Sequence, residues 1–136
     1  MADKMCITVA TGSVDRLTGM AVLVSAAAAM DMEVEIFLQL WGVYAFKKDV
    51  INKNMNLIEF KELGPQVVEG IKRANIPPWF EMLKQAREVG KVKIYACSAA
   101  SKIWDVKKED LEMVDEIIGA GEWLDKMKEA KINLFI

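Results

Sequence analysis

The residue best suited to covalent chemistry stands at the end of an apolar run in residues 92–102, VKIYACSAASK. The run is typical of a buried strand, and it stops at Cys97, which small residues follow. Backbone N–H groups of residues 98–101 could point at the sulfur, because residues after a strand often begin a helix and a helix N-terminus stabilises a thiolate. We interpret Cys97 as a candidate nucleophile, with a buried, unreactive thiol as the alternative.

The absence of histidine limits what this cysteine can do. It excludes Cys-His and Ser-His pairs, imidazole bases and histidine-containing metal sites. The other cysteine, Cys6, lies inside an apolar run at residues 4–10, about 13 Å before the end of that predicted strand. A disulfide needs Cα atoms within about 7 Å, so we interpret Cys6 as a core residue. We predict no metal site and no cofactor.

Strand-like runs alternate with helical segments along the chain. Strands are predicted at residues 4–10, 33–39, 91–96, 115–118 and 132–136. Helices are predicted at residues 14–30, 43–48, 77–89 and 122–130, a short turn or helix near 99–104, and weaker helical patches at 57–63, 66–74 and 107–113. Ser13 is a predicted N-cap and Gly90 a predicted C-cap. This alternation predicts an α/β fold, a three-layer α/β/α sandwich with a mostly parallel five-stranded sheet.

We expect a single domain over residues 1–136, a length that buries about two thirds of the surface of the unfolded chain. Residues 49–76 carry the weakest pattern, and we interpret them as a mobile excursion or small lid.

In such a sheet, ligands bind beyond the carboxyl ends of the parallel strands. Three short segments are expected there: Thr11-Gly12-Ser13, Leu40-Trp41-Gly42 and Cys97-Ser98. We therefore predict Cys97 as the catalytic residue and Gly12, Ser13, Trp41, Gly42 and Ser98 as substrate-binding residues. The triplet Gly119-Ala120-Gly121 begins like a dinucleotide fingerprint, but Leu124 occupies the third glycine position, which favours a plain strand-to-helix turn.

The composition excludes some partners. The net charge is −2 without a block of like charge, so no nucleic-acid surface is expected. The apolar stretch at residues 20–30 is about half the length of a membrane span, and we expect a soluble, cytoplasmic protein that does not bind membranes. A hydrophobic content of 53% is high for a short chain and favours a homo-oligomer.

Three segments carry a family resemblance: ATGSVDRLTGMAVLVSAAAAMDMEVEIFLQLWGVYAFKKD, KIYACSAASKIWDVKKEDL and GAGEWLDKMKEAKINLFI. They resemble the DsrE/DsrF-like sulfur-relay superfamily, especially its branch of peroxiredoxin-like DsrE proteins. The resemblance covers most of the chain and is weakest over residues 52–75. It implies an α/β/α sandwich with a parallel five-stranded core, assembled into homo- or hetero-oligomers.

The resemblance also implies a role for Cys97, because the superfamily carries persulfide or thiosulfonate sulfur on a cysteine after a central strand. The Ala96-Cys97-Ser98 context matches, whereas the second nearby cysteine of some members is missing from residues 98–102 and Val106 replaces a usual glycine. No Thr-x-x-Cys peroxidatic motif is present, which disfavours a thiol peroxidase.

The leading hypothesis is a small sulfur-transfer or sulfur-carrier protein. Its partners would be sulfur donor and acceptor proteins or small sulfane-sulfur compounds. The alternative is a non-catalytic ligand-binding or assembly module of the same fold.

Overall fold

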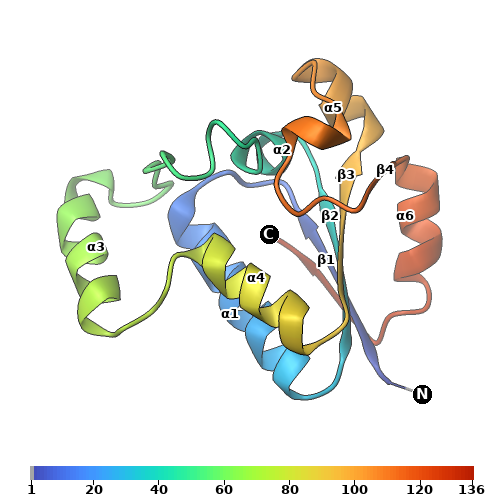
Figure 1. Cartoon of the computed structure of the whole chain (residues 1–136), viewed down its shortest axis with the longest axis horizontal. Coiled ribbons are helices and arrows are strands. Elements are labelled where there is room, and N and C mark those ends of the chain that lie inside the picture. The colour runs from blue at the N-terminus through green and yellow to red at the C-terminus, as the bar shows by residue number, and fades with distance from the viewer. Residues whose placement is uncertain (1) are drawn as a thin grey trace.

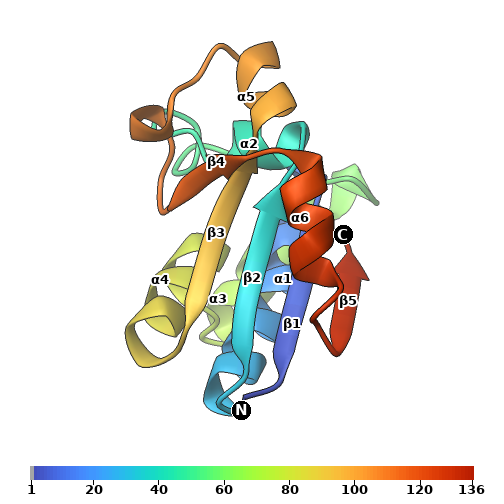
Figure 2. The same cartoon turned by 90° about the vertical axis from the view of Figure 1, so that its right-hand side faces the viewer.

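The computed structural model describes residues 2–136 and is built on one five-stranded sheet whose paired strands are all parallel (Figures 1 and 2). The strands are β1 (Lys4–Val9), β2 (Glu33–Leu38), β3 (Val92–Cys97), β4 (Glu116–Ile118) and β5 (Ile132–Phe135). Their order across the sheet is β4-β3-β2-β1-β5. The prediction of an α/β fold with a parallel five-stranded sheet is confirmed.

Helices cover both faces of the sheet, which makes three layers. They are α1 (Val14–Ala29), α2 (Trp41–Ala45), α3 (Gly64–Arg73), α4 (Trp79–Val89), α5 (Ser98–Ile103) and α6 (Ala120–Met127), with short 3-10 turns η1 (Lys61–Leu63) and η2 (Lys108–Asp110). Helices α1 and α4 lie on one face and α6 on the other (Figure 1). The chain steps from β1 through β2 and β3 to β4 in one direction across the sheet. The last step, from β4 to β5, runs in the opposite direction. Since parallel crossovers are right-handed, the reversed step places α6 on the opposite face.

The alanine-rich stretch after β1 forms the core helix α1. Its buried residues recur at three- and four-residue spacing: Leu17, Met20, Ala21, Val24, Ala27 and Ala28. Small side chains on this face allow α1 to lie close to its neighbours. In the described part of the chain, no helix combines the length and apolar character that a membrane span requires.

Gly90 is the C-cap of α4, as predicted, but its backbone is extended rather than left-handed, with φ −142°. The reason for glycine here is packing, since a Cβ at Gly90 would lie 3.0 Å from the Cβ of Ala28 in α1. Ser13 also holds its predicted N-cap position, although its side chain caps no helical N–H. Its hydroxyl lies 2.9 Å from that of Thr11 instead.

Two predicted helical patches are wrong over most of their length. Residues 57–63 form only the three-residue turn η1, preceded by Phe60 in the left-handed region at φ 43°. Residues 107–113 form only η2. In both, tertiary hydrogen bonds override helix propensity: the Ile58 N–H donates to Asp15 in one, and the Glu112 N–H donates to the Phe46 carbonyl in the other. The predicted patch at 66–74 is confirmed as α3, while the mobility of residues 49–76 stays a prediction.

A partly buried ion pair ties α4 to the two strands beside it. The Arg87 guanidinium donates to both carboxylate oxygens of Asp115 at 2.9 and 3.0 Å and to the Met113 carbonyl at 3.1 Å. Asp115 also accepts the N–H of Ile94 in β3 at 2.8 Å. Burial raises the pKa of Asp115, but the hydrogen bonds from Arg87 and Ile94 outweigh this effect and hold the pKa below its ordinary value.

Replacing this carboxylate should weaken the fold in a pH-dependent way. Asp115→Asn should lower the free energy of unfolding at pH 7 by about 1–3 kcal/mol, because charged hydrogen bonds to Arg87 are lost. Since the folded state lowers the pKa of Asp115, its contribution is complete above the ordinary aspartate pKa of 3.8 and is lost as the pH falls through the lower folded value. Urea unfolding between pH 7 and pH 2 should therefore show the two proteins converging in acid.

Asp125→Asn is the matched control, because the Asp125–Lys128 pair at 3.0 Å is largely exposed. If Asp115→Asn lowers the free energy of unfolding at pH 7 no more than this control does, the Arg87–Asp115 pair does not stabilise the fold as we predict.

Candidate functional site

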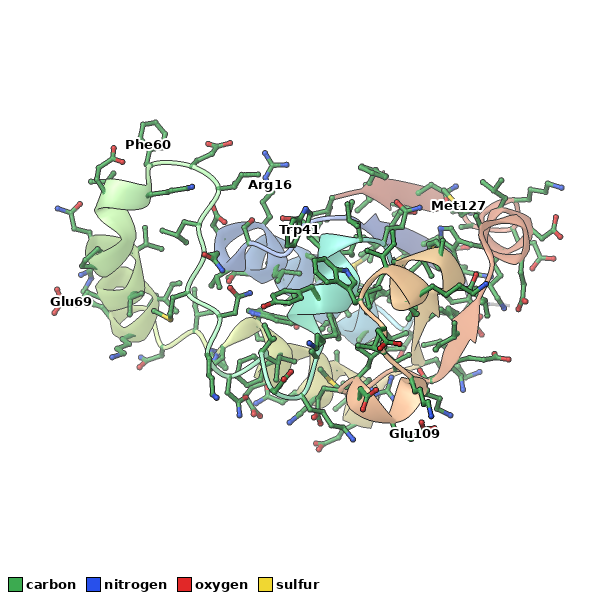
Figure 3. The ribbon with its side chains drawn as sticks, turned by 90° about the horizontal axis from the view of Figure 1, so that it is seen from above. Arg16, Trp41, Phe60, Glu69, Glu109 and Met127 are labelled. Atoms are coloured by element: carbon green, nitrogen blue, oxygen red, sulfur yellow. The ribbon has the colours of Figure 1, made fainter. Side chains whose placement is uncertain are left out.

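Three connections meet above the carboxyl ends of the strands. They are the turn at residues 10–13 before α1, the turn at residues 39–40 before α2, and the junction of β3 with α5. Seen from above, α2 lies between the start of α1 and α5 (Figure 3). This order follows from the sheet, in which β2 separates β1 from β3.

Cys97 is the last residue of β3 and the N-cap of α5. It is nearly buried, with 9% of its surface exposed, and Ile118 of β4 is its neighbour in the ladder. The Ser101 hydroxyl donates to the Cys97 carbonyl at 2.9 Å and fixes the start of α5. The thiol accepts no capping hydrogen bond, so its sulfur is not engaged by the helix start in this structure.

The carboxyl ends of β3 and β4 flank the point where the chain changes faces. The connection after β3 passes on the α4 side, where Arg87 binds the Met113 carbonyl. The connection after β4 runs through α6 on the opposite face (Figure 2). Ligands of open α/β sheets bind in the crevice at such a switch point, and Cys97 lies at this one.

The turn into α6 lies beside Cys97 and was not predicted as part of the site. Gly119 follows Ile118, the ladder neighbour of Cys97. Apart from the neighbouring residues and the backbone of α6 itself, no atom lies within 4 Å of a Cβ built at Gly119 or Gly121. The start of α6 is therefore open. Sequence reasoning identified this segment as a turn, but strand order, which is not encoded locally, was needed to place it.

Three of the predicted substrate-binding residues line a different space. Gly12, Ser13 and Trp41 border a pocket of about 580 Å³ together with Thr11, Arg16, Tyr44, Asn54, Asn56, Lys61 and the chain end, among others. Cys97 and Ser98 are not among its lining residues. Two strand spacings, about 10 Å, separate the ends of β1 and β3. The structure therefore brings Gly12, Ser13 and Trp41 together and sets them apart from Cys97 and Ser98.

The cations of this pocket, Arg16 and Lys61, were missed by sequence reasoning. Arg16 lies one turn into α1 after Ser13, and that spacing could have identified it. Lys61 is in η1, and no pattern in the sequence places it near the start of α1. Glu59 lies 3.5 Å from the Arg16 guanidinium and offsets part of this positive charge.

The turn before α1 is already hydrogen-bonded within the chain. The Ser13 N–H donates to Thr11 Oγ1 at 3.1 Å, and the Val14 N–H donates to the Asn56 carbonyl at 2.7 Å. Asn54 donates to the Gly12 carbonyl at 2.8 Å. The N–H groups of Ser13 and Val14 are thus occupied and are not available to an anion in this pocket.

Cys6 is fully buried beneath α6, with its sulfur 3.9 Å from the Lys126 carbonyl. Burial raises its pKa to about 11, although the nearby Lys4 ammonium acts in the opposite direction. Lys4 itself pairs with Glu35 at 2.8 Å. Cys6 is therefore a neutral thiol at physiological pH, and it lies four residues below the level of Cys97 in the sheet register. Within residues 2–136, no group of three or more cysteines and carboxylates is placed to hold a metal ion.

Comparison with known proteins decides the family. The model of the DsrE/DsrF/DrsH-like family matches residues 1–135. The chain belongs to this family. The uncharacterized protein YrkE of Bacillus subtilis (strain 168) is 23% identical to this DsrE-like protein, and the alignment covers 98% of this chain and 96% of YrkE.

Solved structures share the fold of this DsrE-like protein. The YchN protein from E. coli superposes with a TM-score of 0.61 at 15% identity and covers all of both chains. MTH1491 from Methanobacterium thermoautotrophicum, a protein of unknown function, gives a TM-score of 0.53 at 15% identity over 98% of this chain and 99% of its own. The expected three-layer fold is thereby confirmed.

Aromatic side chains join α2 to the end of α5 in this DsrE-like protein. Trp41 packs on Trp104 with ring centroids 5.0 Å apart, and Tyr44 packs on Trp104 at 4.7 Å. Trp104 Nε1–H donates to the Leu40 carbonyl at 2.7 Å, and Leu40 has a positive φ of 36°. This hydrogen bond holds a backbone conformation that non-glycine residues rarely adopt. Trp41 remains 52% exposed, so it can still contact a ligand from the pocket side.

Gly42 is buried and allows the turn after β2 to pack on the end of β1. A Cβ at Gly42 would overlap the Val9 carbonyl oxygen, and a Cβ at Gly12 would lie 2.8 Å from the Trp41 carbonyl oxygen. Both contacts are with backbone atoms, which cannot move aside cheaply. The two glycines therefore fix the spacing of these turns.

Gly42→Ala should lower the free energy of unfolding by about 1–3 kcal/mol, because the added methyl group meets backbone. Gly19→Ala is the matched control: Gly19 is exposed on α1, and nothing lies within 4 Å of a Cβ there. It should raise stability by about 0.5–1 kcal/mol through helix propensity. Urea unfolding measures both, and wild-type stability in Gly42→Ala would refute the close-packing role.

Proposed function

We propose that this DsrE-like protein is a sulfur carrier that holds sulfane sulfur on Cys97. The observation that carries the proposal is the position of Cys97 at the carboxyl end of β3, at the switch point of the sheet. Membership of the DsrE/DsrF/DrsH-like family supports it, since the fold is of the sulfur-relay type. Cys6 is fully buried with a raised pKa, so it does not compete.

The chemistry is thiol exchange and needs only a thiolate and access. The Cys97 thiolate attacks the outer sulfur of a donor persulfide R–S–SH. A Cys97–S–SH bond forms, the donor S–S bond breaks, and the donor leaves as the thiolate R–S⁻. With tetrathionate, attack on a sulfane sulfur gives a Cys97 thiosulfonate and releases thiosulfate. An acceptor thiolate then removes the sulfur in the same way and restores Cys97.

Residues around Cys97 can assist without a base. The first-turn N–H groups of α5 have no partner within that helix, and the open turn at residues 119–121 leaves room for a donor. Lys102, in the last turn of α5, adds positive charge to this end of the sheet. A chain that contains no histidine can therefore still run the exchange.

A second candidate is a ligand-binding module that does not use the thiol. It is favoured by the pocket of about 580 Å³ that Arg16, Lys61 and Trp41 border, which suits a small anion and does not include Cys97. The limited exposure of Cys97 agrees with this reading.

Mass spectrometry of the native protein separates the two candidates. After incubation with glutathione persulfide or tetrathionate, wild type and Cys6→Ser should each gain one persulfide or thiosulfonate adduct, located on Cys97 by peptide mapping. Cys97→Ser should gain none. In the absence of a donor, iodoacetamide should label Cys97 in the folded protein, and it should label Cys6 only after denaturation.

Labelling of Cys97 by iodoacetamide without any sulfur adduct would contradict the carrier proposal. Resistance of Cys97 to both reagents would favour the binding module instead.

We also propose a homo-oligomer in a reducing, cytoplasmic setting. Both cysteines are free thiols, which suits such a compartment. Apolar side chains on two elements remain exposed: Val22 and Leu23 on α1, and Ile132 and Phe135 on β5. β5 is also an edge strand whose outer edge is unpaired within the described chain. A second copy of the chain would cover these groups.

Sedimentation at micromolar concentration should give a species larger than the 15.3 kDa chain. Val22→Glu and Ile132→Glu should each shift it toward the monomer, because an unpaired carboxylate would be buried in the interface. Val89→Glu is the control: Val89 is 76% exposed on α4, outside these two surfaces. A wild-type monomer would contradict the proposal.

A further inference from the structure

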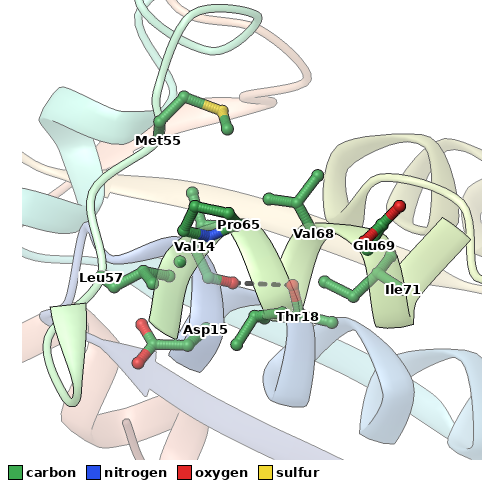
Figure 4. Close-up of a pocket in the computed structure, with 11 residues that line it drawn as sticks. Val14, Asp15, Thr18, Met55, Leu57, Pro65, Val68, Glu69 and Ile71 are labelled. Atoms are coloured by element: carbon green, nitrogen blue, oxygen red, sulfur yellow. Dashed lines mark hydrogen bonds between the residues drawn. The ribbon is translucent and has the colours of Figure 1, made fainter. Parts of the chain in front are cut away.

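An apolar cavity lies between α1, α3 and the extended segment at residues 54–58 (Figure 4). Its volume is about 680 Å³, within the range of small-molecule pockets, about 300–1,000 Å³. Figure 4 shows side chains from all three elements around the space. The aliphatic ones are Val14, Met55, Leu57, Pro65, Val67, Val68 and Ile71.

The cavity is not a filled part of the hydrophobic core. α3 has no buried residue, although its apolar side chains lie on one face. That face is turned toward α1 across the space (Figure 4). A solvent-accessible aliphatic surface of this size is typical of a binding groove.

The polar groups of the cavity share one chemical character. Asp15 and Glu69 supply carboxylates, and the hydroxyl of Thr18 already donates to the Val14 carbonyl at 2.7 Å, which leaves its oxygen free to accept. No lysine or arginine lines the space. These groups therefore favour an occupant that presents a donor or a positive charge.

Asp15 is held as a carboxylate at the edge of the cavity. Burial raises its pKa, but hydrogen bonds from Ser13 and from the N–H groups of Ile58 and Arg16 outweigh this and keep the pKa below its ordinary value. The neighbouring Arg16 side chain does not neutralise the cavity, because it lines the other pocket and lies 3.5 Å from Glu59.

Residues 54–58 separate two spaces of opposite charge. Met55 lines the apolar cavity, whereas Asn54, Asn56 and Ile58 line the pocket that contains Arg16 and Lys61, and Leu57 borders both. The alternation follows from the extended backbone, which sends successive side chains to opposite sides. An anionic ligand would therefore be drawn to the cationic pocket, and a cationic one to the apolar cavity.

We propose that the cavity between α1 and α3 binds an apolar small molecule with a positively charged head. Its aliphatic body packs against Val14, Leu57, Val68 and Ile71, and its head lies near Asp15 or Glu69. The proposal uses no residue of the Cys97 site and does not depend on the sulfur-carrier function.

Fluorescence of N-phenyl-1-naphthylamine, an apolar probe, tests the site in the full chain. One probe should bind per chain, and decylamine should displace it at about tenfold lower concentration than decanoate, a difference of about 1.4 kcal/mol. The two competitors have equal chain length and opposite head charge. The double variant Asp15→Asn/Glu69→Gln should keep the probe and lose this preference.

Val68→Trp should fill the space and weaken probe binding about tenfold or more, an effect of at least about 1.4 kcal/mol. Val89→Trp, on the exposed face of α4, is the matched control and should bind the probe like wild type, as should Cys97→Ser. Circular dichroism and urea unfolding confirm that the variants fold. The proposal is overturned if binding is not saturable, if folded Val68→Trp binds like wild type, or if decanoate competes as well as decylamine.

Discussion

Parallel pairing of all five strands is the constraint on which the rest of the molecule depends. Each strand must return through a crossover to the same end of the sheet, so the carboxyl ends of all five strands lie at one end of it. The order β4-β3-β2-β1-β5 then decides the layers, because the return from β4 to β5 reverses direction and carries α6 to the opposite face. The same reversal places the switch point of the sheet beside Cys97, so the layers and the position of the candidate site have one cause.

Close packing at this edge explains why the candidate site is divided in two. Because Gly12 and Gly42 lack a Cβ, the backbones of the turns after β1 and β2 can pack directly against each other. Trp104 holds the turn after β2 by its hydrogen bond to the Leu40 carbonyl. Trp41 and Tyr44, which line the cationic pocket, pack on Trp104 at the end of α5. Since Cys97 does not line the pocket and residues 119–121 are open, the proposed sulfur donor would approach Cys97 from the side of α6.

The fold and the place of Cys97 could be predicted from the sequence because they follow local patterns. Buried strands read as continuous apolar runs, and α1 carries its core residues at helical spacing. Strand order is a tertiary property, so the neighbourhood of Cys97 and Gly119 could not be read from either segment. The helix predictions at residues 57–63 and 107–113 were wrong because tertiary contacts decide these segments. Hydrogen bonds to Asp15 and Phe46, which are distant in sequence, hold the two backbones in a non-helical conformation.

Residues 49–76, whose sequence pattern was the weakest in the chain, contact the start of α1 and line two spaces beside it. Their hydrogen bonds to Gly12, Val14 and Asp15 anchor the extended part beside α1, and that part supplies a wall to each of two spaces. The N–H groups of Ser13 and Val14 already have partners within the chain, and Arg16 and Lys61 are the cationic side chains that line the pocket. Neither space includes Cys97. The proposed reactivity of the thiol and the proposed binding beside α1 would therefore be separable properties of the chain. A substitution at Cys97 leaves the residues that line both spaces unchanged, and a substitution in either space leaves Cys97 unchanged.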